Sequence, residues 1–151
     1  MEEGDFIAAV NVYQSFLQAR KSASWCQSNF VDFQAITRAV QTRARLMKYL
    51  VKIQVPIQSC GNDIDALRKC ICLAFYRNAA RYNNDGSFTT ILGSQIVYIH
   101  PHSCLFGKQP PHWIVFSEKD DGVKVYAKNV LTIDPIWLPD MLPNSFQLIG
   151  Y

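Results

Sequence analysis

Apolar residues recur every three or four positions through the first half of the chain, a spacing that predicts amphipathic helices. The first such pattern runs through Phe6, Val10, Tyr13 and Leu17, with Asp5 placed to cap the helix. Breaks at Ser22–Ser24 and at Pro56 separate the helical segments from one another. Four helices are therefore expected, over residues 4–20, from Trp25 onward, over residues 34–53 and over residues 63–82.

The period changes from helical to strand-like after Tyr82. Asn83–Gly86 is a turn signal, and Asp121-Gly122 is a second one between two alternating segments. The expected strands cover residues 87–92, 95–99, 113–117 and 123–133. Several short strands with Asp-Gly turns favour a small antiparallel barrel. Trp137 and Leu138, in a closing segment over residues 135–142, are placed to plug one of its ends.

Together these patterns predict an α+β fold in which a helical segment, residues 1–82, leads into a barrel, residues 83–151. With 151 residues, 49% of them apolar, the chain can bury its own core as one compact domain or two small ones. No apolar run approaches the length that crosses a bilayer, and the acidic start lacks the features of a signal peptide. We therefore expect no membrane partner.

Basic residues gather in the middle of the sequence. Residues 20–81 hold eleven Lys and Arg against three Asp, whereas both flanks are net acidic. A basic middle suits phosphate contacts, although helix faces exposed to water have the same composition. The five cysteines are odd in number and irregularly spaced, which argues against a disulfide framework. They favour a reducing intracellular compartment, nuclear or cytoplasmic.

The sequence contains no motif of an ATPase. It has neither a Gly-x-x-x-x-Gly-Lys-Ser/Thr loop nor Asp-Glu-Ala-His, so we expect no ATP hydrolysis by this chain. His100, His102 and Cys104 share one side of an extended segment, but three candidate ligands without a second pair are too few for a zinc finger. No catalytic residue, metal or cofactor is therefore predicted.

Six short motifs are spread along the chain. They are Gly4-Asp5 with Asn11-Val12-Tyr13, Trp25-Cys26 with Phe30, Arg68-Lys69-Cys70, Phe75-Tyr76-x-Asn78-x-Ala80, His100-Pro101-x-Ser103 and Trp137-Leu138. In identity and order they resemble the C-terminal region of DEAH-box ATP-dependent RNA helicases, and the resemblance extends almost end to end. It implies the end of a helical ratchet domain followed by an OB-fold, without the helicase core.

The resemblance leaves two functions open. In the first, the chain is an RNA-binding accessory module that holds single-stranded RNA and docks on the helicase core or its activator proteins, in RNA processing, splicing or ribosome assembly. In the second, it is a non-catalytic protein-interaction module whose RNA-binding face has decayed. The second is favoured by Asp120 and Asp121, which stand where the family carries an apolar run ending in Thr-Thr-Lys. Two carboxylates there repel a phosphate backbone.

The best candidates for RNA contact lie in the last expected strand. Lys124, Tyr126 and Lys128 alternate with Val123, Val125 and Ala127, so that one strand face carries two cations around an aromatic ring and the other packs inward. Cations follow a phosphate backbone and an aromatic ring stacks on a base, which is how OB-folds hold single strands. An ordinary solvated strand face has the same alternation.

Further candidates have weaker arguments. Arg77 and Arg81 stand four residues apart on the expected fourth helix, where they either contact phosphates or form a solubilising face. Arg43 falls on an apolar stripe, and we expect it to pair with a buried carboxylate and to tie the helical segment to the barrel. An RNA contact is its alternative role. The resemblance implies structural roles for His100, Ser103 and Trp137.

Overall fold

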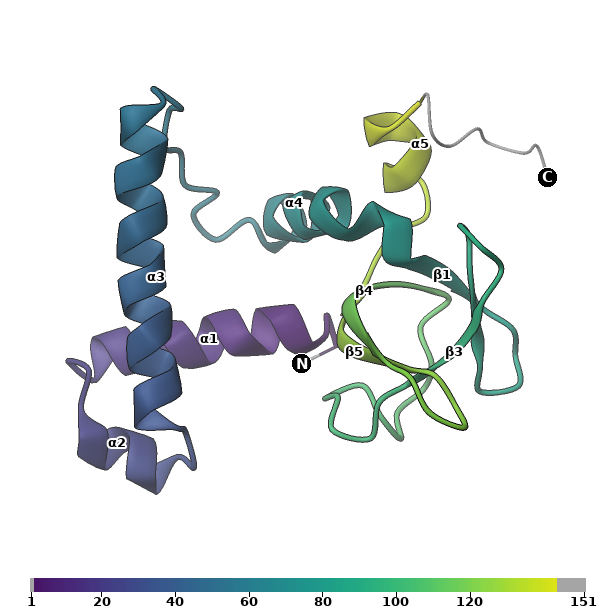
Figure 1. Ribbon diagram of the computed structural model, residues 1–151, viewed down its shortest axis with the longest axis horizontal. Coiled ribbons are helices and arrows are strands. Elements are labelled where there is room, and N and C mark those ends of the chain that lie inside the picture. The colour runs from purple at the N-terminus through teal and green to yellow at the C-terminus, as the bar shows by residue number, and fades with distance from the viewer. Residues whose placement is uncertain (1, 144–151) are drawn as a thin grey trace. The chain divides into compact units, whose positions relative to one another are not determined.

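The computed structural model describes residues 2–143, and the end of the expected barrel segment, residues 144–151, lies outside the described residues. Its helices are α1 (Asp5–Gln18), α2 (Ala23–Ser28), α3 (Phe33–Lys52), α4 (Ile64–Phe75) and α5 (Trp137–Met141), with a 3₁₀ turn η1 (Tyr76–Asn78) after α4 (Figure 1). Side-chain caps fix three of the starts, because Ser22, Asp32 and Asp63 accept backbone N–H bonds from the first turns of α2, α3 and α4. None of the helices within residues 2–143 is long and apolar enough to span a membrane.

Five strands close into a barrel in the order β1-β2-β3-β5-β4. The strands are β1 (Ala79–Tyr82), β2 (Phe88–Thr90), β3 (Ile96–Ile99), β4 (Trp113–Asp120) and β5 (Tyr126–Thr132). The α+β class and the small barrel are thus confirmed. The expected all-antiparallel pairing is wrong for one pair, because β3 and β5 run parallel, with Tyr98 opposite Tyr126. The Asp121-Gly122 hairpin joins β4 to β5 as expected.

The expected fourth helix is too long. It ends at Phe75, and residues 79–82 form β1, the first strand of the barrel. Ala79 and Ala80 are fully buried in two different apolar clusters, so this segment needs small side chains on both faces. The Asn78 side chain fixes the change of direction, since its Nδ2 donates to the Phe116 carbonyl of β4 at 2.9 Å.

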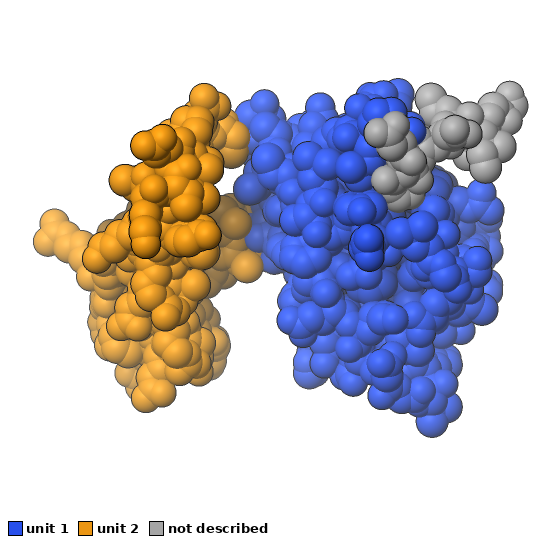
Figure 2. Space-filling view, turned by 45° about the horizontal axis from the view of Figure 1, so that its top comes forward, with its two compact units in different colours: residues 1–8, 62–151 blue, residues 9–61 orange. Residues whose placement is uncertain are grey.

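The chain divides into two compact units, coloured separately in Figure 2. Unit 1 comprises residues 1–8 and 62–151, and unit 2 comprises residues 9–61. The barrel unit therefore includes α4 and the beginning of the chain, whereas our expected boundary followed residue 82.

Unit 1 has two apolar clusters. The barrel interior is filled by buried side chains that include Phe88, Ile114 and Phe116. A second cluster lies between the barrel, α4 and α5, where Trp137 and Leu138 pack beside Cys72. The closing segment thus packs against the barrel as its pattern suggested.

The beginning of α1 is anchored to the barrel. Asp5 is the first helical residue rather than a cap, and its Oδ1 and Oδ2 accept the backbone N–H groups of Cys104 and Val130, each at 2.8 Å. Gly4 makes this close approach possible, because it has φ +115° and a Cβ there would lie 2.2 Å from the Val130 carbonyl oxygen. The motif Gly4-Asp5 therefore ties the start of the chain to β5.

Unit 2 buries a small core and exposes several large apolar side chains. Phe16, Cys26 and Ile36 form its buried cluster. The second half of α3 and the chain after it expose large apolar side chains: Leu46, Tyr49, Val51, Ile53, Val55 and Ile57. Arg43 is also exposed and forms no ion pair within the described part of the chain, so its expected pairing with a buried carboxylate is wrong. Its position on α3 leaves the guanidinium in water, so no buried partner is needed.

Candidate nucleic-acid interface

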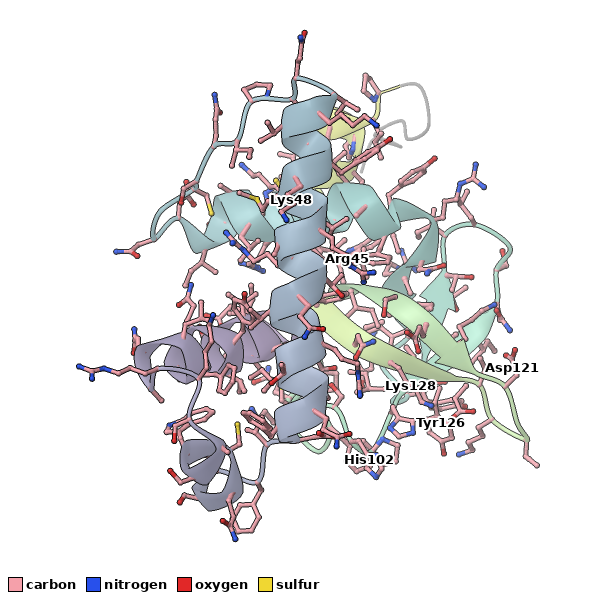
Figure 3. All side chains as sticks on the ribbon, turned by 60° about the vertical axis from the view of Figure 1, so that its left-hand side comes forward. Arg45, Lys48, His102, Asp121, Tyr126 and Lys128 are labelled. Carbon is pink, nitrogen blue, oxygen red and sulfur yellow. The ribbon has the colours of Figure 1, made fainter. Side chains whose placement is uncertain are left out.

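The outer face of β5 carries the residues that the alternation singled out. Ala127 is fully buried, whereas its neighbours Tyr126 and Lys128 are half-buried and point away from the barrel interior. Figure 3 shows both on this strand, with Asp121 at the hairpin turn. Lys124 is exposed just before the strand begins. The expectation that Val123 packs inward is wrong, because it lies in the hairpin turn, beyond the paired residues, and is fully exposed.

Tyr98 joins this face from the neighbouring strand. Its ring centroid lies 6.3 Å from that of Tyr126, as the parallel register predicts for directly opposed residues. The Lys124 Nζ stands 4.8 Å from the Tyr98 ring centroid, in cation–π geometry. We call Tyr98, Lys124, Tyr126 and Lys128 the tyrosine-lysine patch. It places two aromatic rings between two cations on one face of the barrel.

Lys128 is engaged by a carboxylate. Its Nζ lies 2.7 Å from Oδ2 of Asp120, the last residue of β4 and a diagonal neighbour across the strand pair. The hydrogen bond and charge of Lys128, with a smaller contribution from His100, hold the pKa of Asp120 below its usual value. Asp120 is therefore ionised at neutral pH. It lies beside Lys128, which the strand alternation predicts to contact RNA.

The segment after β3 forms a hydrogen-bonded turn. The His100 Nδ1 accepts the backbone N–H of His102 at 3.1 Å, the His100 carbonyl accepts the backbone N–H of Ser103, and the Ser103 Oγ accepts that of Leu105. Because Nδ1 is an acceptor, a neutral His100 carries its proton on Nε2, which faces Asp120. Within residues 2–143 no group of His, Cys, Asp and Glu has the arrangement of a metal site.

Arg77 and Arg81 do not share a helix face. Arg77 lies in η1 with its Nε 3.4 Å from the Tyr76 Oη, and Arg81 is exposed on β1. Strand β1 pairs with β2 and β4, whereas the patch lies on β3 and β5. The structure therefore brings neither arginine to the tyrosine-lysine patch.

Helix α3 places part of the basic middle of the sequence along one face, which we call the basic stripe. Arg38, Arg45 and Lys52 are seven residues apart, and Lys48 falls on the same face, so four exposed cations follow one side of the helix. Figure 3 labels Arg45 and Lys48 on it. The spacing of seven residues between these cations is the sequence pattern that predicts a basic helix face.

Arg68, the first residue of the motif Arg68-Lys69-Cys70, makes structural contacts that the sequence does not predict. Its Nη2 donates to the Thr132 carbonyl at 2.8 Å and to the Thr132 Oγ1 at 3.0 Å, while Nη1 pairs with Asp65. The guanidinium also lies 5.0 Å from the Trp137 ring centroid. These contacts join α4, β5 and α5 around the buried Trp137 ring.

The cysteines differ in exposure rather than forming pairs. Cys70 is exposed and Cys72 is buried, as expected for thiols two residues apart on a helix. Burial raises the pKa of Cys72 to about 11, and burial together with Asp5 raises the pKa of Cys104. Raised pKa values suppress the thiolate, so neither side chain is prepared to act as a nucleophile.

Comparisons with known proteins agree with this architecture. Residues 67–145 match the model of the oligonucleotide/oligosaccharide-binding (OB)-fold family. Over 97% of its length the chain is 37% identical to the probable ATP-dependent RNA helicase DHX35 of Pongo abelii and 36% identical to that of Homo sapiens. It is 31% identical, over 96% of its length, to the pre-mRNA-splicing factor ATP-dependent RNA helicase DEAH10 of Arabidopsis thaliana.

The matched region is a small part of each relative. The chain spans 20%, 21% and 22% of the three relatives, about a fifth of their length. These matches confirm the resemblance to DEAH-box RNA helicases that the six motifs suggested. By its barrel and by the family match over residues 67–145, the chain belongs to the OB-fold family found in these helicases.

Proposed function

We propose that this chain is an RNA-binding accessory module that holds single-stranded RNA on the outer face of its barrel. The observation that carries the proposal is the tyrosine-lysine patch, where the Tyr98 and Tyr126 rings lie 6.3 Å apart beside Lys124 and Lys128. Aromatic rings stack on bases regardless of sequence, and cations follow the phosphates. The module is therefore expected to bind RNA with little sequence preference.

The relatives supply the context of the proposal. Their names describe ATP-dependent RNA helicases and, for one, a pre-mRNA-splicing factor. We infer that the module works with a helicase core, inside the cell and in RNA processing, splicing or ribosome assembly. The core supplies ATP hydrolysis, and this chain contributes a surface that holds the strand. Arg77 and Arg81, which lie away from the patch, are proposed only as secondary phosphate contacts.

The test is RNA binding at two salt concentrations. Fluorescently labelled oligouridine is titrated with the wild type and with a Lys124→Ala/Tyr126→Ala/Lys128→Ala variant, and anisotropy is measured. Each phosphate contact contributes roughly −0.7 to the slope of log affinity against log salt. We expect the wild type to bind with a slope of about −2 or steeper, and the variant to lose at least about 0.7 of that slope, the contribution of one phosphate contact at Lys124.

A matched control is available on α3. The variant Lys48→Ala/Tyr49→Ala/Lys52→Ala removes the same residue types from an exposed helix face. It should keep the affinity of the wild type. Loss of affinity in this control with retention in the barrel variant would place RNA on the basic stripe of α3 instead. No binding by a folded wild type would refute RNA binding by the chain.

A second function is favoured by exposed apolar residues of unit 2. Leu46, Tyr49 and Ile53 follow one face at the end of α3 and are each about half exposed, and we call them the apolar stripe. Phe30, which precedes α3, has a backbone φ of +55° and is 99% exposed. Exposed apolar residues that follow one helix face are typical of protein interfaces. We propose the remainder of the helicase, or an activator protein, as the partner of this stripe.

This docking function has its own test. Calorimetry would measure binding of the chain to the human relative from which the matched 147 residues have been removed. A Leu46→Ser/Ile53→Ser variant should bind more weakly, whereas Lys124→Ala/Lys128→Ala should bind as the wild type does. Equal affinity of all three proteins would refute docking through the stripe.

A further inference from the structure

A pocket opens on the outer face of the barrel beside the tyrosine-lysine patch. Its volume is about 460 Å³, and all its walls belong to unit 1. The lining side chains are polar or charged: Asp5, His100, His102, Ser103, Asp120, Lys128 and Asn129. They come from the beginning of α1, the turn after β3, the end of β4 and the middle of β5.

The donors of this pocket converge on one carboxylate oxygen. The Asp120 Oδ2 lies 2.7 Å from the Lys128 Nζ and 3.9 Å from the His100 Nε2. The His100 ring in turn lies 4.8 Å from that of His102, measured between centroids. A carboxylate at this point occupies the position that an external anion would take.

The other carboxylate of the pocket, that of Asp5, is held by backbone hydrogen bonds. Both oxygens of Asp5 accept backbone N–H groups at 2.8 Å, so they are fixed by the fold. Asp120 is different, because its side chain is 51% exposed and its only charged partners among the described residues are Lys128 and His100. The Asp120 carboxylate can therefore leave the pocket by a side-chain rotation into water.

The pocket is continuous with the aromatic rings of the patch. The His100 ring centroid lies 5.7 Å from that of Tyr126, which is itself 6.3 Å from that of Tyr98. Lys128 belongs to both the pocket and the patch. A base stacked on Tyr126 thus has the pocket beside it, within reach of the nucleotide's own phosphate.

We propose that this pocket receives one backbone phosphate of single-stranded RNA, and that Asp120 is a built-in competitor that occupies Lys128 until the phosphate displaces it. This inference rests on the proposed RNA-binding function and adds to it a phosphate site and a residue that weakens binding. The exchange replaces one anion by another at Lys128, so this contact adds little affinity in the wild type. Neutralising Asp120 removes the competitor and leaves the cation in place.

The test compares two neighbouring substitutions. Asp120→Asn should tighten binding of oligouridine about fivefold, the range expected when one exposed ion pair no longer competes. It should also steepen the salt slope by about 0.7, one phosphate contact. Asp121→Asn is the matched control, since it makes the same charge change one residue away, and Asp121 has no ion pair within residues 2–143. It should change affinity less than twofold.

Two further arms identify the partner of the phosphate. In a Lys128→Ala background the gain from Asp120→Asn should disappear, because the freed cation is no longer present. With an abasic RNA of the same length the gain should persist, because the site reads phosphate rather than base. Circular dichroism and thermal melting establish that each variant is folded.

The outcomes separate this inference from the proposed function. Equal gains from Asp120→Asn and Asp121→Asn, a gain that survives Lys128→Ala, or a gain lost on abasic RNA would each overturn the competitor role while leaving RNA binding intact. No binding by either the wild type or Asp120→Asn would overturn both. Binding that appears only in Asp120→Asn would support the competitor role and refute RNA binding by the unsubstituted chain.

Discussion

Replacing Asp5 tests the anchor between the start of the chain and the barrel. Its two carboxylate oxygens accept the N–H groups of Cys104 and Val130, each at 2.8 Å. Asp5→Ala leaves both N–H groups without this acceptor. Asp5→Asn keeps one acceptor but turns an NH₂ group toward the other N–H, so it loses one bond and creates a clash of donors.

The magnitude follows from the charge on the acceptor. A hydrogen bond to a charged group contributes roughly 1.5–3 kcal/mol, and both of these are partly buried. We therefore expect Asp5→Asn to lower the free energy of unfolding by about 2 kcal/mol and Asp5→Ala by about 4 kcal/mol. With a urea slope near 2 kcal/mol per molar, the midpoints should fall by about 1 M and about 2 M.

Tryptophan fluorescence during urea unfolding measures this change in unit 1. Trp113 and Trp137 belong to that unit, and a common Trp25→Phe background removes the signal of unit 2. Asp121→Asn serves as the control, because it makes the same chemical change at an exposed position. If the free energies of unfolding of both Asp5 variants lie within about 0.5 kcal/mol of that of this control, the anchor does not stabilise the barrel.

Four more predictions concern single side chains. Gly4→Ala should destabilise the barrel by at least about 3 kcal/mol in urea, since its Cβ meets backbone at 2.2 Å; a change below about 1 kcal/mol would contradict that geometry. Arg68→Lys should lower the free energy of unfolding by about 1–2 kcal/mol in the same assay, because a lysine cannot contact Thr132 and Asp65 at once; an unchanged free energy of unfolding would refute this role of Arg68. A thiol reagent should modify Cys70 rapidly and Cys72 only after unfolding; equal rates in the folded protein would refute burial. The pKa of Asp120 is lower in the folded protein, so its ionised carboxylate stabilises the fold at pH values above the ordinary carboxyl range. This stabilisation is lost as the pH falls below about 4. The urea midpoint of Asp120→Asn should therefore decrease less in acid than that of the wild type.

Local periodicity was enough to predict most elements but not the start of the barrel. The helical stripe and the alternating strands each depend on a repeating pattern within a few residues. At Ala79 and Ala80 that pattern fails, because both residues are buried and alanine is also a strong helix former. Only pairing with β2 and β4, which are distant in sequence, makes this segment a strand.

The candidate site shows the same limit. Alternation found Tyr126 and Lys128, because both lie on one strand. Tyr98 was not found, since its place beside Tyr126 depends on the parallel pairing of β3 with β5. Asp120 was recognised as a source of repulsion, but its contact with Lys128 follows from the diagonal register across the hairpin. Contacts between strands are set by register, which periodicity within one strand does not determine.

The anchor of Asp5 also sets an order of events during synthesis. Asp5 and Val130 are 125 residues apart in sequence, so one partner leaves the ribosome long before the other exists. The 53 residues of unit 2 lie between the two parts of unit 1 and contain mainly local helical contacts, which form quickly. Once unit 2 has folded, fewer flexible residues separate Asp5 from β5, and the entropy cost of closing that loop falls. Slowing translation after residue 61 should therefore favour correct closure of the barrel. Mutations that unfold unit 2 should make barrel closure slower.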